Sequence, residues 1–321
     1  MSEVRLQMVA KPTVISLFAG CGGSSLGYQM AGFRELLAVE WNDRAVETFK
    51  VNFPDVPVWH GDIHDLTGKE CLRIAGLASG ELDVLDGSPP CQGFSTAGER
   101  RLSDPRNSLF EEFARLLQDL QPRVFVMENV TGMIKGPMKQ VYLEIVKVLR
   151  SCGYRVKGQV LNAMYFGVPQ SRERVIIVGV RNDLGIEPSC PKPQLVPPTV
   201  REAIGHLPEG QPGNHSAQLI AAWYKSRPNQ SLRKACKFVG SLQSVRLDPN
   251  TPSPTQIKAH LNWHWKIPRQ LTIQEAACIQ SFPETWRFIG GKGNARDQIG
   301  NSVPPLMMKA IAEHIKDKIL C

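Results

Sequence analysis

The chain has 321 residues, of which 42% are hydrophobic and 21% are charged, and its formal net charge is +8. This balance is ordinary for a globular protein and excludes the disordered and collagen-like classes. The N-terminal residues mix charges with apolar positions, and no window reaches the roughly 18 apolar residues of a spanning helix, so we expect neither a signal peptide nor a membrane segment. Eight cysteines stand singly, without the dense spacing of a disulfide framework, which indicates a reducing cytoplasm.

The positive charge is concentrated in one part of the chain. Residues 182–270 contain 11 Lys and Arg against 5 Asp and Glu, which leaves 27 against 25 for the rest. Within that part, residues 210–247 hold six basic residues and no acidic one, with Trp223, Tyr224 and Phe238 between them. Basic side chains that neutralise phosphates, beside aromatic rings that stack on bases, are typical of a nucleic-acid-binding surface. A solvated basic face is the alternative.

The first 180 residues alternate short apolar runs with helical periodicity. The pattern predicts strands over 14–18, 35–40, 82–86, 124–127, 155–161 and 174–180, and helices over 24–31, over 43–53 and around 109–120. Such alternation favours an α/β fold, with a parallel sheet and helices on both of its faces.

A proline-rich stretch then changes the character of the chain. Five prolines between residues 188 and 198 exclude a regular helix or a central strand there, so we expect a domain boundary. Regular structure is expected again over 272–281. After Pro304 and Pro305, apolar residues at helical spacing predict a C-terminal helix.

The ends of the first three strands carry residues suited to an adenosine-type ligand. The turn "FAGCGG" allows close backbone approach and positive φ, although Ser25 stands where a dinucleotide fingerprint has its third glycine. Glu40 ends the second strand, where an acid can bind ribose hydroxyls, and Asp62 follows a probable third strand. Each residue alone is equally consistent with an ordinary turn or cap.

A candidate nucleophile follows the strand at 82–86. Pro89 and Pro90 hold the chain extended, so the thiol of Cys91 is expected at the sheet edge and not in the core. Residues 92–107 have the composition of a mobile loop. Glu128 ends the neighbouring strand and could donate a proton, and Arg172 and Arg174, two residues apart, should share one face.

Eight stretches occur in one order along the chain: "FAGCGGSSLG", "AVEWN", "GDI", "GSPPCQGFSTAG", "MENV", "QSRERV", "RQLTIQEAACIQSFP" and "QIGNSVPP". In this order the sequence resembles the DNA (cytosine-5)-methyltransferase family, of the compact bacterial type. The likeness covers nearly all of the chain outside residues 182–250.

The resemblance implies an S-adenosylmethionine-dependent methyltransferase fold, Rossmann-like, with a mostly parallel sheet that includes one antiparallel strand. It also implies a discontinuous catalytic domain of residues 1–181 and 285–321, with a smaller target-recognition domain of residues 182–284. The cofactor is then S-adenosyl-L-methionine, with S-adenosyl-L-homocysteine as product. Its implied contacts are Phe18, Gly20, Gly22, Gly23, Glu40, Trp41, Asp62, Ile63, Pro89, Asn301 and Val303.

The resemblance also implies a reaction. Cys91 would add to carbon 6 of a cytosine flipped out of duplex DNA, and Glu128 would neutralise charge at ring nitrogen 3. Arg174 would hold the base, and Arg172 would orient nearby acid and phosphate groups. The expected DNA contacts are Gln92, Ser95, Arg106, Lys225, Arg227, Arg233, Lys234 and Lys237.

Further expectations concern metals, partners and rival functions. Two histidine pairs stand four residues apart, His60 with His64 and His260 with His264, but no third ligand completes either set and we expect no metal. We expect a monomeric, cytoplasmic bacterial enzyme acting on duplex DNA, beside a restriction endonuclease for the same site. The alternatives are an RNA (tRNA) cytosine-5 methyltransferase on the same scaffold and a catalytically silent DNA-binding relative.

Overall fold

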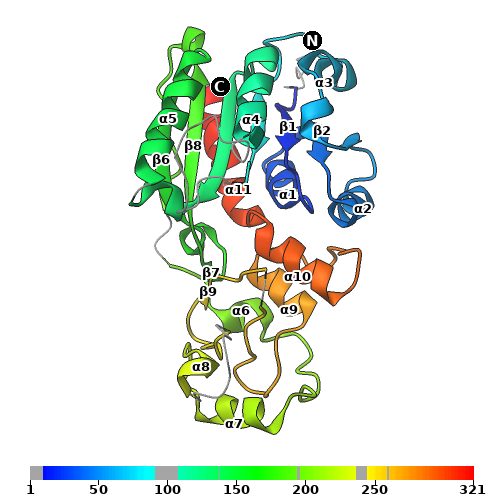
Figure 1. Cartoon of the computed structure of the whole chain (residues 1–321), viewed down its shortest axis with the longest axis vertical. Coiled ribbons are helices and arrows are strands. Elements are labelled where there is room, and N and C mark those ends of the chain that lie inside the picture. The colour runs from blue at the N-terminus through cyan, green and yellow to red at the C-terminus, as the bar shows by residue number, and fades with distance from the viewer. Residues whose placement is uncertain (1–9, 91–107, 137, 194–195, 236–243, 259) are drawn as a thin grey trace, which may run out of the picture.

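The computed structural model describes residues 10–90, 108–136, 138–193, 196–235, 244–258 and 260–321. Figure 1 shows two regions along the long axis of the molecule. A sheet and its helices lie at one end, and a smaller region of short helices and loops lies at the other. In the described part of the chain, no helix is long and apolar enough to cross a membrane.

A seven-stranded sheet forms the centre of the larger part, in the order β3-β2-β1-β4-β5-β8-β6. Its strands are β1 (Thr13–Leu17), β2 (Arg34–Glu40), β3 (Val58–His60), β4 (Val84–Gly87), β5 (Val124–Val130), β6 (Tyr154–Asn162) and β8 (Glu173–Arg181). Strands β1 to β5 are parallel to one another, whereas β8 runs antiparallel to both β5 and β6. The predicted mostly parallel sheet with one antiparallel strand is therefore confirmed.

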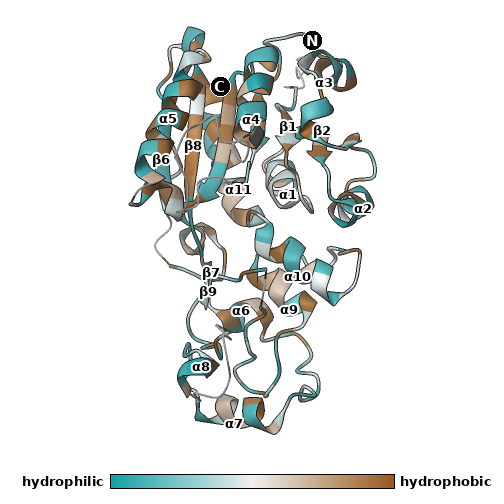
Figure 2. Ribbon diagram, in the orientation of Figure 1, coloured by the Kyte–Doolittle hydropathy of each residue, from teal (hydrophilic) through white to brown (hydrophobic). Residues whose placement is uncertain are grey.

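Helices cover both faces of this sheet, as predicted. The helices of this part are α1 (Gly23–Met30), α2 (Asp43–Asn52), α3 (Gly68–Ala75), α4 (Ser108–Leu120), α5 (Met138–Ser151) and α11 (Pro305–Ile315). One buried cluster joins the sheet to α4 and α5 through residues such as Phe113 and Ile145, and a second joins the opposite face to α11 through Met308 and Ile311. Figure 2 shows hydrophobic residues along β1 and β8 and mixed colours on α5, because a helix buries only one stripe.

The smaller region is built from short elements. They are α6 (Val200–Ile204), α7 (Ala217–Lys225), α8 (Leu232–Ala235), α9 (Ile273–Ile279) and α10 (Lys292–Asn301), with a parallel pair of β7 (Gln170–Ser171) and β9 (Ser253–Pro254). Single 3-10 turns lie at Ile63–Asp65, Thr131–Ile134, Ala163–Phe166 and Asn182–Leu184, and α11 continues into a π-helical turn over Lys316–Leu320.

The proline-rich stretch behaves as predicted. Of residues 185–199 that the structure describes, none lies in a helix or strand. Beyond it, a third buried cluster joins Val200 and Ile204 of α6 and Ala276 of α9 to Leu26 of α1 and Phe49 of α2. The smaller region is thus packed against the side of the sheet where the glycine-rich turn lies.

Candidate active site

The turn after β1 is held in a conformation that side chains seldom allow. Phe18 has a φ of 58°, Gly20 of 56° and Gly22 of 90°, all in the left-handed region. Glu40, at the end of β2, fixes this turn from the side: its Oε2 accepts the Gly20 N–H at 2.8 Å, and its Oε1 accepts the N–H groups of Trp41 at 3.0 Å and Asn42 at 2.8 Å. The carboxylate is buried at the edge of the sheet, and as an acceptor-only group it suits a diol.

The neighbouring strand ends complete this edge. Trp41 is 74% exposed, which leaves an indole face free beside Glu40. Asp62 follows β3 and accepts the backbone N–H of His64 at 3.0 Å, a hydrogen bond that lowers the pKa of its carboxyl, and Ile63 is buried. A carboxylate for hydroxyls, an aromatic face and a rigid glycine turn fit the ribose, adenine and methionine parts of S-adenosylmethionine.

The C-terminal segment reaches the same turn. A Cβ placed on Gly23 would lie 2.4 Å from the carbonyl oxygen of Val303, so only glycine permits this approach. Val303 is buried, and Asn301, two residues earlier in the chain, is exposed. The structure therefore brings the glycine-rich turn of residues 18–23 against Glu40 on one side and against Val303 of the C-terminal segment on the other.

Glu128 and Arg174 form a pair at the end of β5. The Nε of Arg174 lies 2.8 Å from Oε1 of Glu128, and their side chains are only 13% and 11% exposed. The next residue, Asn129, donates from Nδ2 to the carbonyl oxygen of Pro89 at 3.0 Å. One edge of the sheet thus holds both the acid and the backbone that leads to Cys91. Cys91 itself lies outside the described residues, as do Gln92, Ser95, Arg106 and Lys237.

Arg172 makes different contacts from those predicted. Its Nη1 donates to the carbonyl of Gln256 at 3.0 Å, and its Nη2 donates to those of Gly300 at 2.9 Å and Ser302 at 3.1 Å. Burial, together with the nearby Arg174, lowers its pKa to about 9. This geometry holds the segment that carries Asn301 and offers no exposed fork for a phosphate.

Three buried glutamines at this junction were missed by the sequence analysis. Gln170 donates to Oε1 of Gln280 at 2.6 Å and accepts the N–H of Gln256 at 2.9 Å, and Gln280 donates to the carbonyl of Ser302 at 2.8 Å. They join β7, α9 and the C-terminal segment. An amide carries no charge or spacing signal of its own; Gln170 and Gln280 lie inside the stretches "QSRERV" and "RQLTIQEAACIQSFP", whereas Gln256 lies in none of the eight stretches.

Comparison with known proteins gives the family. The model of the C-5 cytosine-specific DNA methylases matches residues 12–317. The chain belongs to this family. It is thus an enzyme that methylates carbon 5 of cytosine in DNA with S-adenosylmethionine as methyl donor.

Individual relatives agree with this assignment. The methylase is 38% identical to the Type II methyltransferase M1.HphI of Haemophilus parahaemolyticus, over 94% of this chain and 86% of the relative. It is 32% identical to the Type II methyltransferase M.XorII of Xanthomonas oryzae, over 96% and 85% of the two chains. A crystal structure of a prophage-encoded E. coli protein, described as a DNA modification methyltransferase, superposes with a TM-score of 0.83 at 26% identity, covering 97% of this chain and all of that one.

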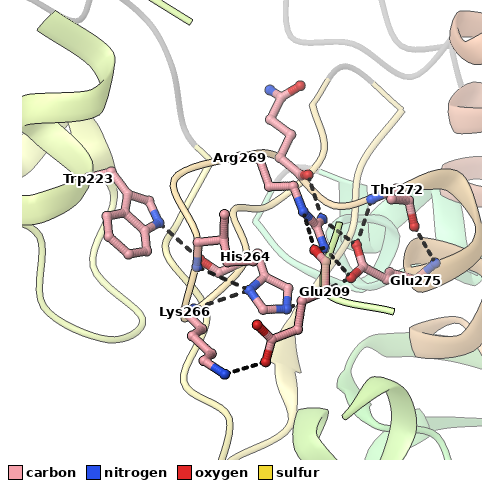
Figure 3. A network of polar contacts seen from close by, with 9 residues as sticks. Glu209, Trp223, His264, Lys266, Arg269, Thr272 and Glu275 are labelled. Carbon is pink, nitrogen blue, oxygen red and sulfur yellow. Dashed lines mark hydrogen bonds and ion pairs between the residues drawn. The ribbon is translucent and has the colours of Figure 1, made fainter. Parts of the chain in front are cut away.

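The smaller region of the methylase contains a buried ion pair between Arg269 and Glu275, shown in Figure 3. Arg269 points both Nη atoms at the carboxylate of Glu275, each at 2.7 Å, and the backbone N–H of Thr272 donates to the same carboxylate at 2.7 Å. Arg269 also donates from Nε to the carbonyl of Glu209 at 3.0 Å. The pair fastens the loop before α9 to the start of that helix.

The four histidines singled out for their spacing have local partners or are partly buried. His264 is buried, its Nδ1 accepts the N–H groups of Lys266 at 3.1 Å and Ile267 at 3.3 Å, and burial lowers its pKa to about 4 (Figure 3). His60 pairs with Asp43 at 2.9 Å and His64 with Asp62 at 2.6 Å. His260 is partly buried. Among the described residues, no group of three candidate metal ligands occurs.

Two residues of the basic stretch are structural. Trp223 is 3% exposed and donates from Nε1 to the carbonyl of His264 at 2.9 Å, so it cannot stack on a base as predicted. Arg246 lies over that ring at 4.0 Å and donates to the carbonyl of Trp265 at 2.8 Å. The exposed cations lie around α7 and α8: Lys225, Arg227, Arg233 and Lys234. In the part of the chain that the structure describes, none of these four pairs with an acid.

Proposed function

We propose that this methylase modifies a cytosine within a short duplex DNA sequence by a covalent mechanism in which Cys91 is the nucleophile and Glu128 the acid. The observation that carries the proposal is the shared sheet edge: Asn129 holds the Pro89 carbonyl, two residues before Cys91, and the adjacent Glu128 is paired with Arg174. A nucleophile and an acid brought to one edge can act on opposite sides of the same ring.

The residue types match the difficulty of the reaction. Carbon 5 of cytosine is a poor nucleophile, so the Cys91 thiolate first forms a bond to carbon 6, and the electron pair of the 5,6 double bond makes carbon 5 enamine-like. Glu128 supplies a proton or hydrogen bond at ring nitrogen 3, where negative charge would otherwise develop. Arg174 holds Oε1 of that carboxyl and fixes its orientation toward the ring.

Bound S-adenosylmethionine supplies an electrophilic methyl group to carbon 5. The residues proposed to hold it are the turn of Phe18, Gly20, Gly22 and Gly23, then Glu40 for the ribose, Trp41, Asp62 and Ile63 for the adenine, and Pro89, Asn301 and Val303 around them. Arg172 acts here as a positioning residue, because it grips the carbonyls on both sides of Asn301. Loss of the carbon 5 proton then returns the electron pair and expels the Cys91 thiolate.

A stacked cytosine cannot reach a thiol at the sheet edge, so the base must be extruded, at a cost of a few kcal/mol. We assign this task to the loop of residues 92–107 and to a target-recognition domain of residues 182–284, with residues 1–181 and 285–321 as the catalytic domain. Exposed Lys225, Arg227, Arg233 and Lys234 would contact phosphates, which position the protein without reading sequence.

We also propose an oligomeric state, a cellular compartment and a partner enzyme for the methylase. One chain holds both the catalytic residues and the basic region, which supports a monomer acting in the bacterial cytoplasm on nucleoid DNA. The Type II relatives support a restriction endonuclease directed at the same site.

One assay tests the proposal. Purified protein is incubated with cofactor labelled in the methyl group and with duplex DNA or tRNA, beside the variants Cys91→Ala and Cys321→Ala. Cys321 is an exposed free cysteine and serves as the matched control. We expect label in DNA for the wild type and for Cys321→Ala, and none for Cys91→Ala. Label in RNA alone would exclude the proposed substrate, and activity of Cys91→Ala would exclude the mechanism.

A further inference from the structure

Helix α1, which follows the glycine-rich turn, has few apolar residues to hold it in place. Its sequence is GSSLGYQM, in which Leu26 is buried and Met30 is 41% exposed. A helix of eight residues is marginal in water and lacks here the apolar stripe that usually docks a helix. Its position, and that of the turn before it, must come from other tertiary contacts.

One set of contacts is made with the C-terminal segment. Gly23 and Gly27 are four residues apart and so share a face of α1. A Cβ on Gly27 would lie 2.6 Å from the Cβ of Met308, and one on Gly23 would lie 2.4 Å from the Val303 carbonyl. On this side, Gly27 lets the helix approach α11 closely, and Gly23 lets it approach the segment just before α11.

The face toward the sheet is polar. The Tyr28 hydroxyl donates to Oδ1 of Asp86 at 3.3 Å, and the two residues are 0% and 3% exposed. The Ser24 hydroxyl, one turn earlier on the same face, also interacts with the Asp86 carboxyl. The hydroxyls of Ser25 and Ser16 lie 3.4 Å apart. Asp86 therefore meets α1 at two successive turns.

Asp86 also belongs to the strand that leads to the nucleophile. It pairs with Ser16 of β1 in the sheet, and β4 ends one residue later at Gly87. The chain then passes through Pro89, whose carbonyl is held by Asn129, to Cys91. The buried side chain of Asp86 thus contacts α1, the helix that follows the glycine-rich turn. Asp86 itself belongs to β4, the strand that leads to Cys91.

We propose that Asp86 is a positioning residue: by accepting the hydrogen bond of Tyr28, it fixes α1 and the Gly20–Gly23 turn relative to the strand that leads to Cys91. The inference rests on the proposed function in that this turn holds the cofactor. The bond requires an acceptor oxygen at position 86 and does not require a negative charge. Asn should therefore replace Asp86, and Ala should not.

The test is the affinity for S-adenosylmethionine, measured by calorimetry without DNA, so that no turnover is needed. Loss of a buried hydrogen-bond partner corresponds to between about fivefold and a hundredfold in affinity when the bond organises the site. We expect increases of the dissociation constant in this range for Tyr28→Phe and Asp86→Ala, and a change within about threefold for Asp86→Asn.

The matched control is Tyr154→Phe. Its hydroxyl is equally buried and donates to the Pro122 carbonyl at 2.8 Å, so the variant loses the same kind of bond away from α1. It should lower the melting temperature and leave the affinity for the cofactor unchanged. Equal affinities for Tyr28→Phe and Tyr154→Phe would overturn the proposal, as would an Asp86→Asn variant as weak as Asp86→Ala.

A milder variant covers the case in which Asp86→Ala does not fold. Ser24→Ala removes the second hydroxyl beside Asp86 and should weaken cofactor binding by a few fold, whereas an unchanged affinity in both Ser24→Ala and Tyr28→Phe would contradict the inference. Wild-type turnover on duplex DNA is measured in parallel. A wild type that binds cofactor without methylating DNA would refute the proposed function, and the binding comparison would still decide the role of Asp86.

Discussion

Arg174 of β8 and Glu128 of β5 form an ion pair diagonally across the two antiparallel strands, with Nε 2.8 Å from Oε1 and both side chains nearly buried. The pair lies at the edge of the sheet where Asn129, the residue after Glu128, donates a hydrogen bond to the Pro89 carbonyl. An arginine that grips one oxygen of a carboxyl restricts its rotation, so the second oxygen has a defined direction. This relationship places the acid of the proposed reaction on a rigid element instead of a loop.

Glu128→Gln should slow methyl transfer far more than it weakens DNA binding. Glutamine keeps the size and the acceptor for Arg174 but cannot donate a carboxylic proton, and general acid catalysis contributes roughly 10²–10⁴-fold. We expect turnover to fall by at least about a hundredfold, with the DNA dissociation constant within about threefold. Glu187→Gln, which changes an exposed acid paired with Arg155, is the control and should leave both unchanged. Equal losses of turnover and affinity would argue against the acid role.

Gly27→Ala should destabilise the protein. The new methyl group would lie 2.6 Å from the Met308 Cβ and 2.7 Å from the Pro305 carbonyl, and forced overpacking costs about 1–3 kcal/mol. Gly293→Ala in α10 makes the same change in a helix with nothing within 4 Å, and should be neutral or slightly stabilising. Urea unfolding of both variants checks this. Similar midpoints would mean that α1 does not depend on its close approach to α11.

Two buried acids, Asp86 and Glu35, should stabilise the protein less as the pH rises toward 8, because they retain their protons in the folded state. Burial raises the pKa of Asp86 to about 7 and that of Glu35 to about 8, and repulsion from Glu128 on the first and from Asp86 on the second adds to the effect. Between about pH 4 and 8 the unfolded chain has lost the protons that these two acids keep in the folded chain, so their contribution to the free energy of unfolding decreases over this window.

Asp86→Asn isolates the contribution of Asp86. The amide does not titrate, so the stability of the variant relative to wild type should improve by about 2–4 kcal/mol between pH 4.5 and 8, at about 1.4 kcal/mol for each unit of pKa shift. His264 is present in both proteins and cancels in the difference, whereas Glu35 loses the repulsion of Asp86, which shifts the difference in the same direction. Urea unfolding at several pH values, without cofactor, measures it. Parallel curves for the two proteins would show that Asp86 is ionised throughout.

Arg233→Ala combined with Lys234→Ala should weaken DNA binding in a salt-dependent way. Both side chains are exposed at α8, and removing one cation from a phosphate reduces the slope of log affinity against log salt by about 0.9. We therefore expect a slope reduced by up to about 2, equally for target and random duplexes. Lys69→Ala in α3 with Lys318→Ala in the C-terminal turn removes the same charge, and Figure 1 shows α3 and the C-terminus at the opposite end of the molecule from α8. The same slope for both double variants would remove α8 from the DNA surface.

Much of the fold could be predicted because local pattern and tertiary structure agree in the sheet. The strands at 34–40 and 173–181 are apolar runs bounded by charges, and Asn42 and Thr272 are cap residues that mark the start of α2 and α9. The strand ends then put Glu40 and Glu128 at one edge, because parallel strands share their direction.

The failures have a common physical cause, which is burial of polar groups. The residue types of Trp223 and Arg246 predict contacts with nucleic acid. In the structure, however, Trp223 is buried and the guanidinium of Arg246 stacks on its ring. Arg172 reads as a phosphate ligand, yet its partners are the carbonyls of residues distant in the chain, such as Gly300. For Asp86 the sequence predicts only that it ends a strand, and it gives no sign of the buried contact with Tyr28. Which polar residue is buried, and against what, depends on contacts that no local spacing encodes.

The most direct test of the account uses duplex DNA in which the target cytosine carries fluorine at carbon 5. Fluorine cannot leave as a proton does, so thiolate addition and methyl transfer should leave the enzyme bonded to the base. Peptide mass spectrometry of the denatured complex should then place the methylated base on Cys91, with no adduct on RNA of the same sequence. Methylated DNA without any covalent complex, or an adduct on another cysteine, would contradict the account.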